Sequence, residues 1–454
     1  MNHRTGREQL FQWDGRPPAG ASLSLALQHV VAMIVGCVTP PIIIANAIGL
    51  SQTDRVLLIQ SSLIMSAICT LIQLYPINRY FGSGLPVMLG VSFAYLPSML
   101  AIAGTGGIAA ITGSMIVGGL IAALVGIFIK RIRKLFPPVI TGTVVLTIGL
   151  SLYPTAINYM AGGTANTYEL IVEKKGLTEA LIYGSWQNWL IAILTLAIVI
   201  FLNHRAKGVC RLASILIGML AGYLIAFLFG MVDFSEISSA SLFALPRPLH
   251  FGIRFDLASC IALGLLYAIN SIQAIGDFTA TTLGGLNREP TDRELQGGII
   301  AYGFSNILTA LCGGLPTATF SQNVGIVTTN KVVNRSVFTL AGFFLLASGI
   351  SPKFAAILTT VPQCVLGGAT ISVFSTIAMT GMKLIASQAF TPRNTTIVGL
   401  SAALGVGVSQ ASASLSQLPA GFTMIFGKSP VVIATLAAVL LNLILPKEQD
   451  ADAL

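Results

Sequence analysis

The feature that most constrains this chain is a succession of long apolar segments between residues 22 and 446. A helix that spans a bilayer needs about 20 mostly apolar residues. Fourteen segments fit that description, near 22–49, 53–75, 86–104, 107–129, 137–157, 188–204, 212–230, 256–283, 296–314, 316–330, 336–350, 364–385, 394–410 and 428–446. Only 9% of the 454 residues are charged, against about 25% in soluble domains. We therefore expect an all-α polytopic membrane protein, not a soluble, fibrous or disordered chain.

Basic residues gather in short clusters between these segments, as at Lys130, Arg131, Arg133 and Lys134. If the amino terminus is cytoplasmic, 18 of the 25 Lys and Arg residues fall on the cytoplasmic side, as the positive-inside rule favours. We expect a multi-pass protein of the cell (inner or plasma) membrane, with cytoplasmic tails at 1–21 and 447–454. No basic stretch carries interleaved aromatic residues, so nucleic-acid binding is not expected.

Residue patterns typical of enzymes and of metal or cofactor sites are absent from the sequence. There is no HExxH, no nucleophile elbow with partners and no phosphate-binding GxxxxGK loop. None of the six cysteines share a CxxC spacing, and buried thiols usually serve as small apolar residues. We therefore expect no enzyme activity, no metal and no cofactor, and the missing nucleotide loop argues against an ATP-driven pump.

Two short matches reveal an internal repeat. Ser83–Pro86 resembles Gly313–Pro316, and Pro137 with Thr141-Gly142 corresponds to Pro362 with Leu366-Gly367. The spans therefore divide as seven plus seven. Because seven is odd, the second copy must be inverted in the membrane, an arrangement typical of secondary transporters.

Both copies contain an interrupted apolar segment at the same place. The stretch from Pro316 to Lys331 is too short for a straight span, and its first part, Thr317–Ser321, is strand-like in composition. Its mate, Pro86 to Tyr95, is punctuated by glycine and proline. Paired interruptions of this kind indicate a binding site near the membrane midplane; two ordinary kinked helices are the alternative.

Asp277 is the only acidic residue deep inside an apolar run. Such residues usually mark a substrate or ion path, because a charge at the bilayer centre costs about 2.5–3.5 kcal/mol. Asn270, Gln273 and Thr281 recur with it at spacings of three and four, so the four share one helix face. A polar site on this face is the favoured interpretation, and a seam of interhelical hydrogen bonds is the alternative.

Three further polar residues stand out. His29 is the only histidine well inside a span, and it can serve either proton handling or structure. Gln322 and Asn323 follow the strand-like stretch and open a helix. A primary amide both donates and accepts, which suits the N–H/C=O edge of a nucleobase; a helix cap is the alternative role for Asn323.

These residues resemble the nucleobase–ascorbate transporter family, the second class of nucleobase:cation symporters, which includes xanthine and uracil permeases. Gln322-Asn323-Val324-Gly325 through Lys331 is similar to the family signature, although Asn330 stands where Thr is usual. Gln273–Thr281 resembles the family's eighth span, Gln28-His29 its first and Ser92-Phe93 its third. The resemblance covers essentially the whole chain.

The resemblance implies fourteen spans in two inverted repeats, with short strands in spans 3 and 10. Spans 1–4 and 8–11 would form a core, and spans 5–7 and 12–14 a gate that also makes a homodimer. In residue numbers, spans 1–5 are 22–157, gate spans 6–7 are 188–230, core spans 8–11 are 256–350 and gate spans 12–14 are 364–446. The substrate-binding residues implied are Phe93, Gln273, Phe320, Ser321, Gln322 and Asn323, with cation coupling at Asp277 and His29.

Two positions depart from the family pattern. The family commonly has Glu where Gln273 stands and an acidic residue where Tyr302 stands, so Asp277 is the remaining intramembrane carboxylate. The Gln at position 322 resembles purine-type members. We expect uptake of xanthine or uric acid with a proton, with uracil transport or Na⁺ coupling as alternatives. An anion exchanger on the same fold is a more distant alternative.

Overall fold

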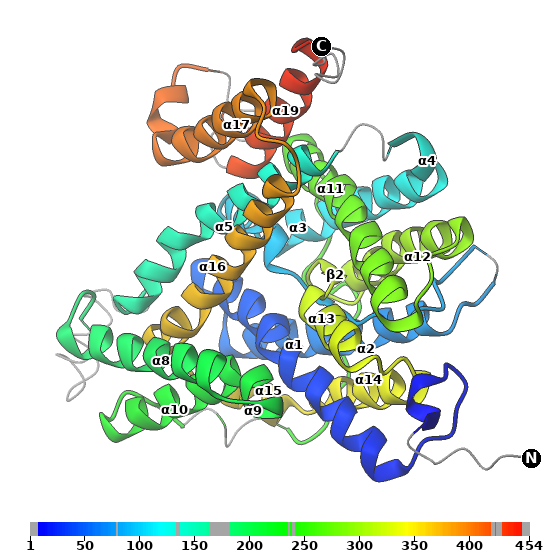
Figure 1. Cartoon of the computed structure of the whole chain (residues 1–454). Coiled ribbons are helices and arrows are strands. Elements are labelled where there is room, and N and C mark those ends of the chain that lie inside the picture. Colours follow the sequence, from blue (N-terminus) through cyan, green and yellow to red (C-terminus); the bar gives the residue numbers. More distant parts are fainter. Residues whose placement is uncertain are drawn as a thin grey trace, which may run out of the picture.

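The computed structural model describes residues 8–78, 80–132, 137–163, 182–234, 237, 241–418, 423 and 429–446, and within them the chain is mostly helical (Figure 1). Residues 1–7 of the expected amino-terminal tail and all of the expected tail at 447–454 lie outside the described residues. The amino-terminal half contains η1 (Glu8–Phe11), α1 (Ala19–Ala47), α2 (Gln52–Leu74), β1 (Leu89–Val91), η2 (Phe93–Tyr95), α3 (Leu96–Ile127), α4 (Ile129–Ile132), α5 (Pro138–Met160), α8 (Trp186–Arg205), α9 (Gly208–Leu212) and α10 (Ser214–Leu228).

The carboxy-terminal half follows a similar order of elements. It contains α11 (Leu257–Thr281), η5 (Thr282–Leu286), α12 (Asp292–Leu311), β2 (Thr317–Thr319), α13 (Ser321–Asn330), α14 (Arg335–Ile350), α15 (Pro352–Thr359), α16 (Gln363–Ala386), α17 (Pro392–Gln410), η6 (Ser412–Leu415) and α19 (Pro430–Ile444). Each half thus places one short strand after its second long helix, as the two interrupted segments predict.

Seven helices in the described residues are long and apolar enough to cross a membrane alone, or eight if α14 and α15, bent by 77° at their junction, are one span. Fourteen segments are expected from the sequence, and the difference has local causes. Helix α3 joins two expected segments, 86–104 and 107–129, across a break at Gly107, whose φ is 65°. Helices α10 and α19 are shorter, with 15 residues each, and α13 has only 10. Helices α12 and α17, with 20 and 19 residues, are long enough but not apolar enough to count among the seven.

Helices α5 and α16 lie side by side through the middle of the molecule (Figure 1). Small residues permit this close approach: a Cβ added at Gly149 would lie 2.4 Å from the backbone nitrogen of Ala378. On one side of the pair, α8 and α10 pack together, and α17 packs with α19 at another corner. The larger body contains α1, α2, α3 and α11 to α14.

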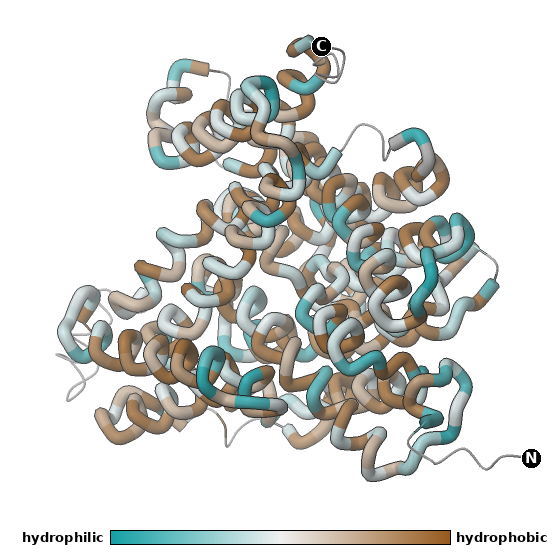
Figure 2. Tube along the Cα trace, viewed as in Figure 1, coloured by the Kyte–Doolittle hydropathy of each residue, from teal (hydrophilic) through white to brown (hydrophobic). Residues whose placement is uncertain are grey.

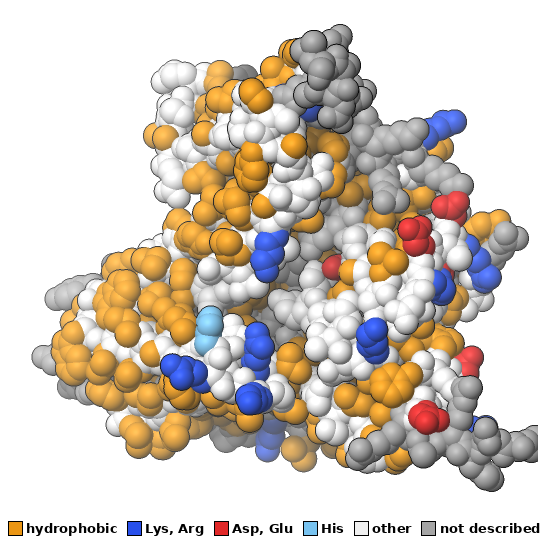
Figure 3. Space-filling model, in the orientation of Figure 1, with side chains coloured by type: hydrophobic (Ala, Val, Ile, Leu, Met, Phe, Trp, Pro, Cys, Tyr) orange, Lys and Arg blue, Asp and Glu red, His pale blue; other side chains and the backbone are white. Residues whose placement is uncertain are grey.

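The outer faces of α8 and α10 are apolar. Large exposed side chains on them include Ile193, Phe201, Leu220, Leu224 and Phe227. Figure 2 shows strongly hydrophobic residues along both helices, and Figure 3 shows hydrophobic side chains over most of that part of the surface. Several Lys and Arg side chains lie in the lower middle of the view in Figure 3, and others lie along its right side. An apolar exterior of this kind is compatible with lipid and not with water.

The described part of the amino-terminal segment is docked on the start of α14. Asn334 Nδ2 donates to the carbonyl oxygens of Gln9, Gln12 and Gly15 at 3.1, 2.8 and 2.9 Å. Arg335 adds an ion pair with Asp14 at 2.9 Å. Residues 9–15 and the amino terminus of α14 therefore lie on the same side of the protein.

Candidate functional site

Two short strands from the two halves of the chain pair at the centre of the larger body. Strands β1 and β2 are antiparallel, with Gly90 opposite Ala318. The ladder extends beyond them, because Phe320 N donates to Met88 O at 3.0 Å and Ser92 N to Pro316 O at 3.1 Å. This pairing satisfies backbone polar groups that could find no water inside a membrane.

Helix α12 holds the second strand in place through a buried amide. Asn306 Oδ1 accepts from Thr317 N at 2.8 Å and from the Tyr267 hydroxyl at 3.0 Å. One turn earlier, the hydroxyl of Tyr302 is hydrogen-bonded to that of Tyr95, the last residue of η2. A single helix therefore fixes β2 and the short helix that follows β1.

A cavity of about 260 Å³ lies where the chain leaves the two strands. Its walls come from η2, the β2–α13 junction, α11, α5 and α16. The lining residues are Ser92, Phe93, Ala94, Val145, Ile148, Gln273, Thr319, Phe320, Ser321, Gln322, Val373, Thr376, Ile377 and Thr380. Pockets for small molecules usually have volumes of roughly 300 Å³ or more. The volume of this cavity is slightly below that range, so it suits a small ligand of one or two rings.

Five of the six predicted substrate-binding residues line this cavity: Phe93, Gln273, Phe320, Ser321 and Gln322. The aromatic rings come from both strand ends, and the two amides come from α11 and α13. The first N–H groups of a helix lack partners within the helix; in α13, Asn323 N and Val324 N donate to Phe320 O at 3.0 and 3.1 Å, so Ser321 and Gln322 are the residues whose backbone amides can face a ligand here. The site therefore combines flat apolar surfaces with groups that both donate and accept.

Asn323, the sixth residue, does not line the cavity and contacts His29 on α1. Its Nδ2 donates to the His29 carbonyl oxygen at 3.0 Å and lies 3.1 Å from His29 Nδ1. Because the carbonyl can only accept, the amide orientation is fixed, and Nδ1 must accept too. His29 is 1% exposed and its ring lies 4.6 Å from that of Phe338. In this arrangement the imidazole is neutral and joins α1 to α13.

Asp277 lies beside the cavity, behind the β2–α13 junction. Ser321 Oγ donates to its Oδ1 at 2.9 Å, and the Thr319 hydroxyl donates to its Oδ2. Both hydroxyl-bearing residues line the cavity, so the carboxyl is one side chain removed from a ligand. Of the other residues on the predicted polar face, Asn270 is bonded to the Leu266 carbonyl within its own helix.

The cavity wall formed by α5 and α16 was not anticipated from the sequence. It consists of Val145, Ile148, Val373, Thr376, Ile377 and Thr380. These residues sit in long apolar helices, where nothing local distinguishes them from residues that face lipid. One signal could have located them: the repeat match at Pro137 and Pro362 makes α5 and α16 equivalent helices, which an inverted repeat would bring to its axis.

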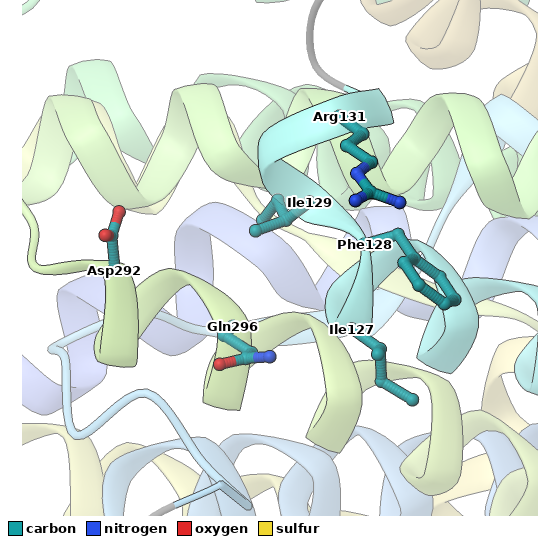
Figure 4. Close-up of a pocket in the computed structure, with 6 residues that line it drawn as sticks. All are labelled: Ile127, Phe128, Ile129, Arg131, Asp292 and Gln296. Atoms are coloured by element: carbon teal, nitrogen blue, oxygen red, sulfur yellow. The ribbon is translucent and has the colours of Figure 1, made fainter.

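A second hollow, of about 190 Å³, lies at the end of α3 (Figure 4). Ile127, Phe128, Ile129 and Arg131 approach it from α3 and α4, and Asp292 and Gln296 from the start of α12 (Figure 4). It contains none of the predicted site residues and no strand end. Within the described residues, no group of three or more His, Cys, Asp or Glu side chains could hold a metal ion.

Comparison with known proteins places this geometry in context. A family model described as the Permease family, Xan_ur_permease, matches residues 20–414. The chain is 34% identical to the xanthine permease of Bacillus subtilis (strain 168), over 94% of each chain. It is 36% identical to the uric acid permease PucK of the same organism, over 95% of this chain and 97% of that one. Xanthine permease XanQ of Escherichia coli (strain K12) is 31% identical, over 98% and 95% of the two chains.

Solved structures show a similar fold at low sequence identity. The transmembrane domain of the cyanobacterial bicarbonate transporter BicA superposes with a TM-score of 0.60 at 15% identity, over 93% of this chain and 97% of that one. The murine anion transporter Slc26a9, in an inward-facing state, gives 0.59 at 9% identity, over 97% and 70%. At these identities the likeness concerns the fold alone.

Proposed function

The chain belongs to the nucleobase–ascorbate transporter family of permeases, and from that premise we propose that it imports a purine nucleobase of the xanthine or uric acid type. It is a multi-pass membrane permease and not an enzyme. The observation that carries the proposal is the cavity in which Gln273 and Gln322 stand beside the rings of Phe93 and Phe320. Flat rings and paired amides are what a planar base with N–H and C=O edges requires.

The alternatives make different demands on the same cavity. An anion exchanger would be expected to offer a fixed positive charge, yet the residues described as lining the cavity include no Lys, Arg or His. Uracil is the runner-up substrate, because its edge also offers alternating donors and acceptors. The relatives named for xanthine and uric acid favour a purine.

The packing supports the proposed division into fourteen spans and two inverted repeats. Helix α2 packs on α14, and the equivalent α12 packs on α3; α8 packs on α16, and the equivalent α17 packs on α5. The antiparallel β1–β2 pair relates equivalent strands in the same way. Each contact thus has a counterpart with the halves exchanged, as two copies around a two-fold axis require.

We assign spans 1–4 and 8–11 to a core and spans 5–7 and 12–14 to a gate. The cavity supports this division, since η2, α11 and α13 of the core form one wall and α5 and α16 of the gate form the other. Motion of one unit against the other would open the cavity alternately to each side. The gate would also provide the homodimer contact.

We assign cation coupling to Asp277, with a proton as the favoured ion and Na⁺ as the alternative. Its carboxyl accepts hydrogen bonds from two residues that line the cavity. Uptake of a proton by the carboxyl would therefore change how these two hydroxyl groups are oriented toward the substrate. His29 is a weaker candidate, because protonating Nδ1 would break its contact with Asn323. We place both termini in the cytoplasm on the basic-residue split.

Transport by the purified protein in lipid vesicles tests this proposal. Uptake of radiolabelled xanthine, urate, uracil, adenine and guanine is measured with an inward pH gradient in sodium-free buffer, with an inward Na⁺ gradient, and with neither. We expect accumulation of xanthine or urate that requires the pH gradient. Labelled bicarbonate and sulfate are tested alongside the bases, and their transport in place of every base would contradict the proposal. Vesicles without protein give the background.

A further inference from the structure

The ring of Phe320 is wedged between two glycines that come from different elements. A Cβ added at Gly36 on α1 would lie 2.8 Å from Phe320 Cε1 and 3.0 Å from Cζ. A Cβ added at Gly90 on β1 would lie 2.9 Å from Phe320 Cε2. Ordinary carbon contacts are about 3.5–4.0 Å, so neither position has room for a methyl group while the ring stays where it is.

Gly36 faces both aromatic rings of the cavity. Its added Cβ would also lie 4.0 Å from Phe93 Cε2, and Phe93 makes an edge-on contact with Phe374 at 5.2 Å between ring centroids. The backbone of Gly36 adopts no left-handed conformation, so an alanine could be accommodated by the helix itself. Lack of space beside Phe320 is therefore what distinguishes this position.

We infer that Gly36 determines substrate size in this permease by setting how far the Phe320 ring extends into the cavity. With a methyl group at position 36, the ring must move. It has little room to move toward β1, because a Cβ built at Gly90 would lie only 2.9 Å from its other edge, at Cε2. The open direction is the cavity that Phe320 lines, so the space left for a ligand shrinks.

The inference rests on the proposed function and refines it. A two-ring purine fills more of the cavity than single-ring uracil, so a smaller cavity should discriminate against purines first. One methyl group in a snug apolar pocket changes discrimination by roughly 10- to 200-fold. Gly36→Ala should therefore lower the purine-to-uracil uptake ratio by about tenfold or more.

The test compares three variants in vesicles. Gly36→Ala should lose purine uptake, and Gly36→Ala with Phe320→Leu should regain part of it, because the smaller side chain yields the space. Gly20→Ala on the same helix is the matched control, since nothing lies within 4 Å of a Cβ there. An unchanged purine-to-uracil ratio in Gly36→Ala, or an equal loss in the double variant, overturns the inference.

A substrate-free measurement separates this inference from the proposed function. Thr376→Cys places a thiol in the opposite wall of the cavity, in a chain whose exposed Cys210 and half-exposed Cys312 are both replaced by serine. Adding Gly36→Ala should slow labelling by a bulky maleimide several-fold, and adding Phe320→Leu should restore the rate. Equal labelling rates overturn the inference, whereas a wild-type protein that carries no base at all contradicts only the proposed function.

Discussion

Ser321 Oγ donates a hydrogen bond to Asp277 Oδ1 across 2.9 Å, joining the first residue of α13 to the carboxy-terminal part of α11. Thr319, the last residue of β2, donates to the other carboxyl oxygen. The carboxyl group therefore holds both sides of the strand-to-helix junction that lines the cavity. Any change in its charge is felt there directly, which makes it a suitable place to link a cation to substrate binding.

Replacing Asp277 with Asn should separate exchange from accumulation. The amide oxygen can still accept one of the two hydroxyl hydrogen bonds, so the junction should keep its shape, but the group can no longer gain or lose a proton. We expect Asp277→Asn vesicles to exchange labelled for unlabelled substrate and to show no uphill uptake driven by a pH gradient.

Asp54→Asn serves as the control for Asp277→Asn. Asp54 lies outside the cavity and is paired with His250 at 2.7 Å, where both side chains are partly exposed, and it should leave accumulation intact. If Asp277→Asn still concentrates the substrate, the carboxyl is structural and coupling must be sought at His29 or nowhere.

Replacing Gln322 with Ala should weaken purine binding without preventing insertion. The amide would be lost from a cavity in which a bound base has few other partners, and an unpaired polar group costs about 1–3 kcal/mol, or roughly 5- to 150-fold in affinity. Equilibrium binding of radiolabelled purine to purified protein measures the change.

Gln296→Ala is the matched control for that experiment, because Gln296 lines the second hollow shown in Figure 4. It should bind purine as the unchanged protein does. If Gln296→Ala lost purine binding and Gln322→Ala did not, the result would indicate that the substrate binds in the second hollow.

Much of the candidate site can be predicted from sequence because polar residues are conspicuous inside apolar runs. Asp277 and Gln322 stand out for that reason, and glycine and proline near residues 84 and 316 mark the interrupted segments. The structure places both segments in one antiparallel strand pair. Local sequence patterns predict no more than this, because the periodicity of a helix shows which residues share a face but not which other helix that face contacts.

The remaining parts depend on contacts between distant segments. Val145 and Thr376 line the cavity although they lie 231 positions apart in the sequence, and an apolar wall resembles a lipid-facing one in sequence. Asn323 and His29 are hydrogen-bonded although they are 294 residues apart in the sequence. Of the two adjacent amides, Gln322 therefore lines the cavity while Asn323 binds α1, and the sequence alone does not distinguish these two roles. The bend between α14 and α15 also cannot be predicted from hydropathy, because the two helices together are apolar enough for one span.

Orientation can be tested by labelling single cysteines with a membrane-impermeant maleimide in intact cells. Both positions chosen are exposed: Ser241, in the loop expected outside, and Ser387, between Lys383 and Arg393 in a loop expected inside. In a background with the six native cysteines replaced, Ser241→Cys should react from outside, and Ser387→Cys only after permeabilisation. The reverse result would invert the proposed topology and the direction of the access path.

Removing one oxygen from the buried tyrosine pair should weaken the support beneath the site. Tyr302 and Tyr95 are both fully buried, and their hydroxyl groups are bonded to each other, so Tyr302→Phe leaves Tyr95 without this partner at a cost of about 1–3 kcal/mol. We expect a lower midpoint of thermal unfolding in detergent.

Tyr75→Phe is the matched control for this variant. The Tyr75 hydroxyl bonds to Thr339 at 2.8 Å, but Tyr75 is 42% exposed and water can replace that bond. Equal midpoints for Tyr302→Phe and the unchanged protein would show that the tyrosine pair does not brace η2 against α12.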